Sequence, residues 1–148
     1  MNFIVAQLLL HCSESFAFWL FVALIEEYEL KEVYGPNLRG LFMHSAIIDV
    51  LVLANLPDLS KRLEQANLGA SVYASEWIIG LFASVVSSEH MVPFFDNFFE
   101  HGWFFFYQLV LTILKQHASS IQSEEDMYNL LRVLKEQTID SPASSSNE

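Results

Sequence analysis

The side chains best suited to chemistry in this sequence are five histidines and one cysteine, which could bind a metal ion or act as acid, base or nucleophile. No two histidines lie at the i, i+4 spacing of a helical zinc pair, and a single cysteine can form neither a thiolate cluster nor an internal disulfide. The lone cysteine fits a reducing compartment and is expected to be a small buried apolar residue. We therefore predict no metal site and no cofactor, and ordinary core or surface roles for His11, Cys12, His44, His90, His101 and His117.

Two groups of acidic residues could also take part in binding or catalysis. Glu26, Glu27 and Glu29 surround Tyr28, which suggests a binding face; a solvated helix end is the alternative, and we favour it. Asp96 stands among phenylalanines, where an unpaired buried carboxylate would be costly. We expect Asp96 to be partnered or at the surface, with a structural role such as capping or pairing with a backbone amide, and not to be catalytic.

The sequence contains no signature of a common catalytic or nucleotide-binding site. There is no Ser-His-Asp pattern, nucleophile elbow or glycine-rich phosphate loop, and the five glycines are isolated from one another. The phenylalanines of residues 94–106 could line a lipid or small-molecule pocket. Aromatic residues at helical spacing more often form a core, and we favour that interpretation. We therefore predict no catalytic or cofactor-binding residue within this chain.

Composition restricts the classes of partner. The 148 residues are 53% hydrophobic, and 18 acidic against 7 basic residues give a net charge of -11. Without a basic patch, nucleic acid is excluded as a partner and unaided attachment to anionic lipid is disfavoured. No apolar run reaches the roughly 18 residues of a membrane-spanning helix, and no Lys or Arg precedes the first apolar stretch, as a signal peptide requires. We expect a cytoplasmic protein without a transmembrane segment.

The apolar periodicity is helical along the chain, and no alternating, β-branched stretch predicts a sheet. The sequence predicts an all-α fold of about eight packed helices, which form one domain over residues 1–137. The Ser-rich residues 138–148 cannot bury a core and are expected to be disordered. The predicted helical segments cover approximately residues 1–10, 16–25, 37–54, 56–67, 73–85, 94–102, 103–117 and 124–137.

Several helix ends and faces can be predicted in more detail. The helix over residues 16–25 carries bulky apolar residues on both faces, so it is expected to be buried on most sides, with Ser13 capping its first turn. Asn55 is a candidate cap for the helix that follows it, and Gly69 could adopt left-handed geometry past the end of that helix. Residues 124–137 form the clearest amphipathic pattern, with an apolar stripe at Met127, Leu130, Leu131 and Leu134.

Several motifs, taken in order, resemble a known family. The sequence Ala-Phe-Trp-Leu-Phe occupies residues 17–21, Leu-Pro-Asp-Leu occupies 56–59, and Trp77 is followed by Leu81-Phe82, with Gly102 further on. Their order and spacing resemble the C-terminal half of the TBC domain, found in GTPase-activating proteins of Rab-type small GTPases. The resemblance covers about residues 1–117. It departs at Phe95-Asp96, where the family usually has Trp-Asp, a change that keeps an aromatic residue.

The first residues resemble the end of another TBC motif, Y-x-Q-G-M-N, entered at Met1. The resemblance implies that two groups supplied by the activating protein assist GTP hydrolysis: an Arg from the motif I-x-x-D-x-x-R and the Gln of Y-x-Q-G-M. Both would lie upstream of Met1, and Arg39, Arg62 and Arg132 occur in unrelated contexts. We therefore expect no catalytic residue in this chain, which resembles half of a TBC domain.

The resemblance implies a regulator of Rab-type GTPases in vesicle trafficking, which is not itself an enzyme and which binds the GTP-bound Rab. Because this chain has neither catalytic group, we expect little activity from it alone. Two alternatives remain: a non-catalytic Rab-binding or scaffold module, and a helical fragment of a longer protein. Cytoplasmic localisation is expected, with peripheral attachment to endomembranes as a further expectation. The apolar residues 1–10 are predicted to be exposed and to promote oligomerisation.

Overall fold

The computed structural model describes residues 2–118. These residues form nine α-helices and one 3-10 turn, with no strand among them, so the predicted all-α class is confirmed. The predicted helix over 124–137 and the tail over 138–148 lie outside the described residues. In chain order the elements are α1 Asn2–His11, α2 Glu14–Glu26, α3 Leu30–Tyr34, the 3-10 turn η1 Pro36–Leu38, α4 Arg39–Asn55, α5 Pro57–Gln65, α6 Ala70–Tyr73, α7 Ser75–Gly80, α8 Ser88–His101 and α9 Trp103–Gln116.

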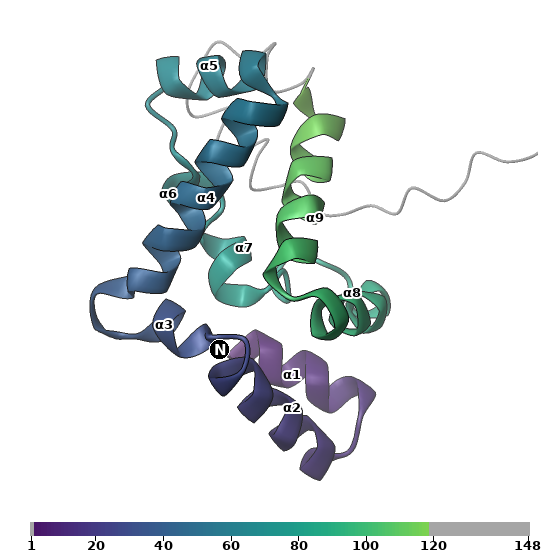
Figure 1. The fold of residues 1–148 in the computed structure, drawn as a ribbon. Coiled ribbons are helices and arrows are strands. Elements are labelled where there is room, and N and C mark those ends of the chain that lie inside the picture. The colour runs from purple at the N-terminus through teal and green to yellow at the C-terminus, as the bar shows by residue number, and fades with distance from the viewer. Residues whose placement is uncertain (1, 119–148) are drawn as a thin grey trace, which may run out of the picture.

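Helix α4 is the central element, because it contacts α3, α5, α6, α7 and α9. Its buried face carries Leu41, Ile48 and Val52, which recur at helical spacing. Figure 1 shows α5 at one end of α4 and the α1–α2 pair near its other end, with α9 rising beside it. The chain is therefore built around α4, and the N-terminal pair lies at the edge of the fold.

The core is unusually aromatic, and its rings come mainly from α8, α9 and the segment after α7. Phe82 lies 5.1 Å from Phe106 and 5.8 Å from Phe94, measured between ring centroids, and Trp103 lies 5.1 Å from Phe106. Phe82, Phe98 and Phe106 are completely buried. Such ring pairs add about 0.5–1.5 kcal/mol each beyond the burial of their surface. The core interpretation is thereby confirmed for Phe94, Phe95, Phe98 and Phe106, whereas Phe104 is 66% exposed.

The sharp turn between α8 and α9 depends on Gly102. This residue has φ +59° and ψ -144°, a conformation that only glycine adopts without strain. Because of the turn, α8 and α9 pack against each other, and they bring Phe98 and Trp103 to 5.6 Å between ring centroids. A turn at this glycine agrees with the expectation from the sequence.

The prediction that residues 16–25 are buried on most sides is wrong. Of α2, only Ala17 and Leu24 are buried, whereas Phe16 and Phe18 are each 59% exposed and Trp19 is 67% exposed. The physical reason is position: α2 packs against α1 and α3 at the edge of the fold, so no helix of the described chain covers its remaining faces.

Predictions for the helix ends also need correction. Ser13 stands before α2, and Asn55 lies inside α4 with its amide donating to the Leu51 carbonyl, so neither side chain caps a helix as predicted. Gly69 has φ -76°; the left-handed residue after α5 is Asn67, with φ 54°.

The expected helix over residues 73–85 is shorter and broken. α6 and α7 are separate short helices, and the chain leaves α7 through two consecutive left-handed residues, Leu81 with φ 44° and Phe82 with φ 59°. Non-glycine residues rarely adopt this conformation. Both side chains are completely buried, and we attribute the turn to that burial, because continuing the helix would carry them away from the aromatic core.

One stretch of the described chain, Pro36–Asn55, is long and apolar enough to cross a membrane by length and composition, with a mean hydropathy of 1.4. Runs of apolar letters in the sequence did not show it, because polar residues interrupt them. It coincides with η1 and α4. The core helix of a soluble protein passes the same test, and α4 packs against five other helices.

Candidate functional site

The most prominent surface feature is an apolar face on the α1–α2 pair. Ile4 and Leu8 of α1 are buried, but the other sides of both helices carry large exposed apolar groups. We call this surface the N-terminal aromatic face. Its members are Phe3, Leu9, Leu10, Phe16, Phe18 and Trp19, all between 48% and 68% exposed.

A groove runs along this face between the two helices. Its volume is about 610 Å³, and its lining includes Val5 and Leu9 from α1 and Phe18, Trp19 and Phe21 from α2. The rings of Phe18 and Trp19 meet edge to face, with centroids 5.4 Å apart, which fixes the shape of one wall. An exposed apolar groove of this kind is typical of an interaction site.

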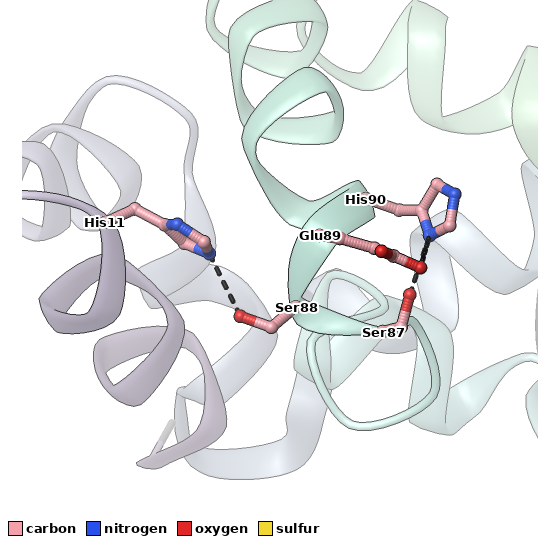
Figure 2. A network of polar contacts seen from close by, with 5 residues as sticks. All are labelled: His11, Ser87, Ser88, Glu89 and His90. Atoms are coloured by element: carbon pink, nitrogen blue, oxygen red, sulfur yellow. Dashed lines mark hydrogen bonds and ion pairs between the residues drawn. The ribbon is translucent and has the colours of Figure 1, made fainter.

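The N-terminal pair is joined to the rest of the fold by polar contacts as well as by packing. At the C-terminal end of α1, His11 Nε2 lies 3.1 Å from Ser88 Oγ at the start of α8 (Figure 2). Gln7 Nε2 donates to the Ala83 carbonyl over 3.5 Å. These contacts orient the pair, and with it the N-terminal aromatic face, relative to the core.

The same junction contains a Ser-His-Glu group that could be mistaken for a catalytic triad. Ser87 Oγ lies 2.6 Å from His90 Nδ1, and Glu89 Oε1 lies 3.7 Å from the same nitrogen (Figure 2). In a triad the serine and the acid lie at opposite ring nitrogens, so that the acid orients the ring while the other nitrogen takes the serine proton. Here both oxygens lie at Nδ1, so this geometry cannot activate Ser87 in that way. We interpret the group as part of the first turn of α8.

Three further hydrogen bonds hold the segment between α2 and α4 against the core. Tyr28 Oη donates to the Phe99 carbonyl over 2.5 Å, and the Trp103 indole donates to the Tyr28 carbonyl over 2.9 Å. Tyr34 Oη donates to the Ile79 carbonyl over 2.5 Å. Burial raises the pKa of Tyr34 to about 12, so its hydroxyl remains a donor at physiological pH.

His44 is the most buried of the five histidines, and it lies inside the fold. It is 2% exposed, its ring stacks on Trp103 with centroids 3.6 Å apart, and its Nδ1 lies 2.6 Å from Tyr107 Oη. Burial lowers the pKa of His44 to about 4, so the ring is neutral at physiological pH. Nε2 has no hydrogen-bond partner among the described residues. In the tautomer with the proton on Nδ1, Nδ1–H donates to Tyr107 Oη and Nε2 keeps an unpaired acceptor lone pair, so no N–H donor is left buried without a partner.

The structure places the other sequence candidates apart from one another. His11, His90 and His101 lie at the surface, and no group of three potential metal ligands occurs within residues 2–118. Asp96 is exposed in the interior of α8, where it cannot cap the helix. Glu26 pairs with Lys31 over 3.0 Å at the end of α2, in agreement with the solvated helix end. Cys12 is half-buried and free.

The arginines considered as catalytic groups are also separated. Arg39 begins α4 and is exposed beside η1, whereas Arg62 lies in α5, near the other end of α4 (Figure 1). The two arginines therefore lie at opposite ends of α4. The sequence did not identify the N-terminal aromatic face on α2, because an apolar pattern on both sides of a helix predicts burial and does not reveal a missing neighbour.

Comparison with known proteins gives a consistent result. Residues 1–122 match the family model described as Rab-GTPase-TBC domain. The chain is 32% identical to Rab GTPase-activating protein eat-17 of Caenorhabditis elegans over 77% of its own length and 13% of that protein. It is 31% identical to Growth hormone-regulated TBC protein 1 of Homo sapiens, over 82% of this chain and 36% of that protein.

A yeast relative extends the comparison. The chain is 33% identical to GTPase-activating protein GYP5 of Saccharomyces cerevisiae over 69% of its own length and 12% of that protein. The chain therefore spans only 12% to 36% of the length of these three relatives.

Proposed function

The chain belongs to the Rab-GTPase-TBC domain family, and from this premise we propose that the protein stimulates GTP hydrolysis by a Rab-type small GTPase. The observation that carries the proposal is the family match over residues 1–122, supported by relatives whose names describe GTPase-activating proteins. The all-helical fold agrees with it. The protein would act as a regulator of an enzyme in vesicle trafficking and would not itself be an enzyme.

The part played by this chain would be structural. Acceleration of GTP hydrolysis by an activating protein requires an arginine that offsets charge on the phosphates, and a glutamine that orients the attacking water. We propose that both groups lie upstream of Met1 and that the helices described here support the surface from which they act. Helix α4 packs against α3, α5, α6, α7 and α9, so it forms the centre of that support.

A GTPase assay on residues 1–148 tests this division of labour. A panel of GTP-loaded Rab proteins is incubated with the chain, and phosphate release is followed under single-turnover conditions. Since an arginine finger contributes roughly 10³–10⁵ in rate, the chain alone should accelerate hydrolysis by far less than a thousandfold. A thousandfold acceleration of GTP hydrolysis would refute the proposal that residues 1–148 lack the catalytic groups. Arg39→Ala and Arg62→Ala would then show which arginine reaches the nucleotide.

The partner is proposed to be the GTP-bound form of the Rab protein, bound in the cytoplasm or at the cytoplasmic surface of an endomembrane, with no transmembrane segment. Retention of the chain on immobilised Rab, loaded with either GTP or GDP, measures the dependence on nucleotide. Equal retention on both forms would argue against it. If retention depends on GTP while hydrolysis is not accelerated, the chain binds the GTPase without activating it.

We further propose that the N-terminal aromatic face promotes self-association of this chain. Phe16, Phe18 and Trp19 expose large rings beside an open groove, and burial of such surface stabilises association by about 25 cal/mol per Å². Sedimentation velocity over a range of concentrations should show oligomers for the wild type and monomers for Trp19→Glu. Phe104→Glu, an exposed aromatic position on α9, is the matched control and should still associate. Identical behaviour of the two variants would contradict the assignment.

A further inference from the structure

A second apolar surface lies at the opposite end of the fold, on the C-terminal half of α4. Val50 is 65% exposed and Leu53 is 61% exposed, although α4 is the central helix of the chain. They follow one another at i, i+3 and so form one stripe. This surface is separate from the N-terminal aromatic face and is not needed for the function proposed above.

The stripe forms one wall of an open groove between α4 and α5. The groove has a volume of about 440 Å³; Val50, Val52 and Leu53 line it from α4, and Leu63 lines it from α5. Asp49 and Glu64 stand in the same lining. The groove is thus lined mainly by apolar side chains together with two acidic ones, and an occupant should carry an apolar stripe with a basic residue beside it.

The Asp49 carboxylate is held in place at the end of this groove. Its Oδ1 accepts a hydrogen bond of 2.9 Å from the Ala70 amide, at the start of α6. The amide stabilises the negative charge and fixes the carboxylate beside Gly69, another lining residue. The acidic character of the groove is therefore built into the connection between α5 and α6, and does not depend on a freely moving side chain.

One segment of this chain has a matching apolar stripe. Residues 124–137 place Met127, Leu130, Leu131 and Leu134 at helical spacing. Lys135, four residues after Leu131, would lie beside that stripe on a helix, where it is placed to pair with an acidic residue of the groove. The segment carries Glu124, Glu125, Asp126 and Glu136 against Arg132 and Lys135, a net charge of -2, so the apolar stripe and not the overall charge is what matches the groove. The segment also lies beyond the residues that match the family model, which end at 122.

The segment can reach the groove. α9 contacts α4, and Figure 1 shows its C-terminal end on the same side of the molecule as α5. From Ala118, the last described residue, to Glu124, where the proposed helix begins, there are six residues, which span up to about 20 Å when extended. A helix of fourteen residues is about 21 Å long, comparable with the length of α4.

From the groove, the apolar stripe and the reach we propose that residues 124–137 form an amphipathic helix that docks into the α4–α5 groove of the same chain. Its leucine stripe covers Val50 and Leu53, and Lys135 at the edge of the stripe lies near Asp49 or Glu64. The contact closes the exposed end of the core and holds the C-terminal segment to the domain.

Hydrogen exchange measured by mass spectrometry on the full chain tests the docking. Backbone amides of residues 127–137 should exchange roughly tenfold or more slowly than in an unstructured peptide of the same sequence. Leu53→Glu in the groove and Leu131→Glu in the segment should each abolish this protection. Phe42→Glu, at an exposed position of α4 outside the groove, and Glu136→Lys, on the polar side of the segment, should retain it. Absence of protection in the wild type, or its persistence in Leu53→Glu, would overturn the proposal.

A crosslink identifies the occupant even if a charged variant folds poorly. In a Cys12→Ser background, Val50→Cys combined with Leu131→Cys should form a disulfide within one chain on mild oxidation. Val50→Cys combined with Asn129→Cys, on the opposite side of the segment, should not. A crosslinked dimer in place of the intramolecular product would show that a second copy fills the groove, and it would overturn docking within the same chain. Neither result depends on GTPase activation.

Discussion

Gly40 offers a direct test of how closely α3 packs on α4. A Cβ at this position would lie 2.6 Å from the Glu32 carbonyl carbon and 2.6 Å from the Val33 amide nitrogen, distances that real Cβ atoms do not adopt. The neighbouring atoms are backbone, so a rotamer change cannot relieve the overlap. Gly40→Ala should gain about 1 kcal/mol of helix propensity in α4. The substitution must also move α3 away from α4. Overpacking of this kind costs about 1–3 kcal/mol, and we expect the upper end of that range because the new Cβ meets backbone atoms.

We therefore expect Gly40→Ala to lower the free energy of unfolding by about 1–2 kcal/mol, which corresponds to a fall in Tm of roughly 2–8 °C for a chain of this size. Gly80→Ala is the matched control, because its new Cβ would meet only Ser84 Oγ at 3.4 Å, and that hydroxyl can rotate. It should leave stability unchanged or raise it by about 0.4–1 kcal/mol. Thermal and urea unfolding followed by circular dichroism at 222 nm measure both. The reasoning fails if Gly40→Ala is as stable as the wild type or as Gly80→Ala.

Three further predictions concern the core. Phe106→Ala, at a completely buried ring, should cost about 3–5 kcal/mol in urea unfolding, whereas Phe104→Ala, at a ring that is 66% exposed, should change stability by less than about 1 kcal/mol. The pKa of His44 is about 4 when folded and 6.5 in the unfolded chain, so between pH 6.5 and 4 only the unfolded state takes up this proton. The contribution of neutral His44 to the free energy of unfolding is therefore present above pH 6.5 and is lost as pH falls toward 4, by up to about 1.4 kcal/mol per pH unit. His44→Gln should reduce the slope of unfolding free energy against pH by that amount in this range. Tyr28→Phe removes the donor to the Phe99 carbonyl and should cost about 1 kcal/mol; equal urea midpoints for variant and wild type would count against that bond.

Much of the fold follows from local patterns in the sequence. The predicted helix over residues 56–67 is found as α5, and Leu59 and Leu63, which recur at i, i+4, form its buried side. The prediction succeeded because a helix presents each side chain at a fixed angle, so the side that packs follows from the periodicity. The predicted boundary between residues 102 and 103 is found as the turn at Gly102, since glycine favours chain turns.

Predictions failed where the answer depended on distant segments. Within the predicted helix over residues 37–54, the apolar side chains Leu38 and Phe42 are 41% and 57% exposed, next to a left-handed turn at residues 37–38 that the local pattern did not predict. The left-handed pair Leu81 and Phe82 could not be foreseen, since no local propensity favours it.

The candidate sites divide in the same way. The sequence predicted exposure of the N-terminal apolar helix, and Phe3, Leu9 and Leu10 are indeed exposed. It did not predict that Trp19 joins them, nor that α4 and α5 leave a groove whose lining includes two acidic side chains, because a surface formed by two helices depends on how they cross.

By itself the sequence determined that the chain is helical, acidic and a member of the Rab-GTPase-TBC domain family, because composition, helical periodicity and motif order are properties of consecutive residues. Only the tertiary structure decided which apolar residues are covered. Burial depends on which helix lies opposite, so similar apolar helices can form a core side in α9 and an exposed aromatic face in α2. The exposed apolar surfaces on α2 and on the C-terminal half of α4 are the ones that the described helices leave uncovered.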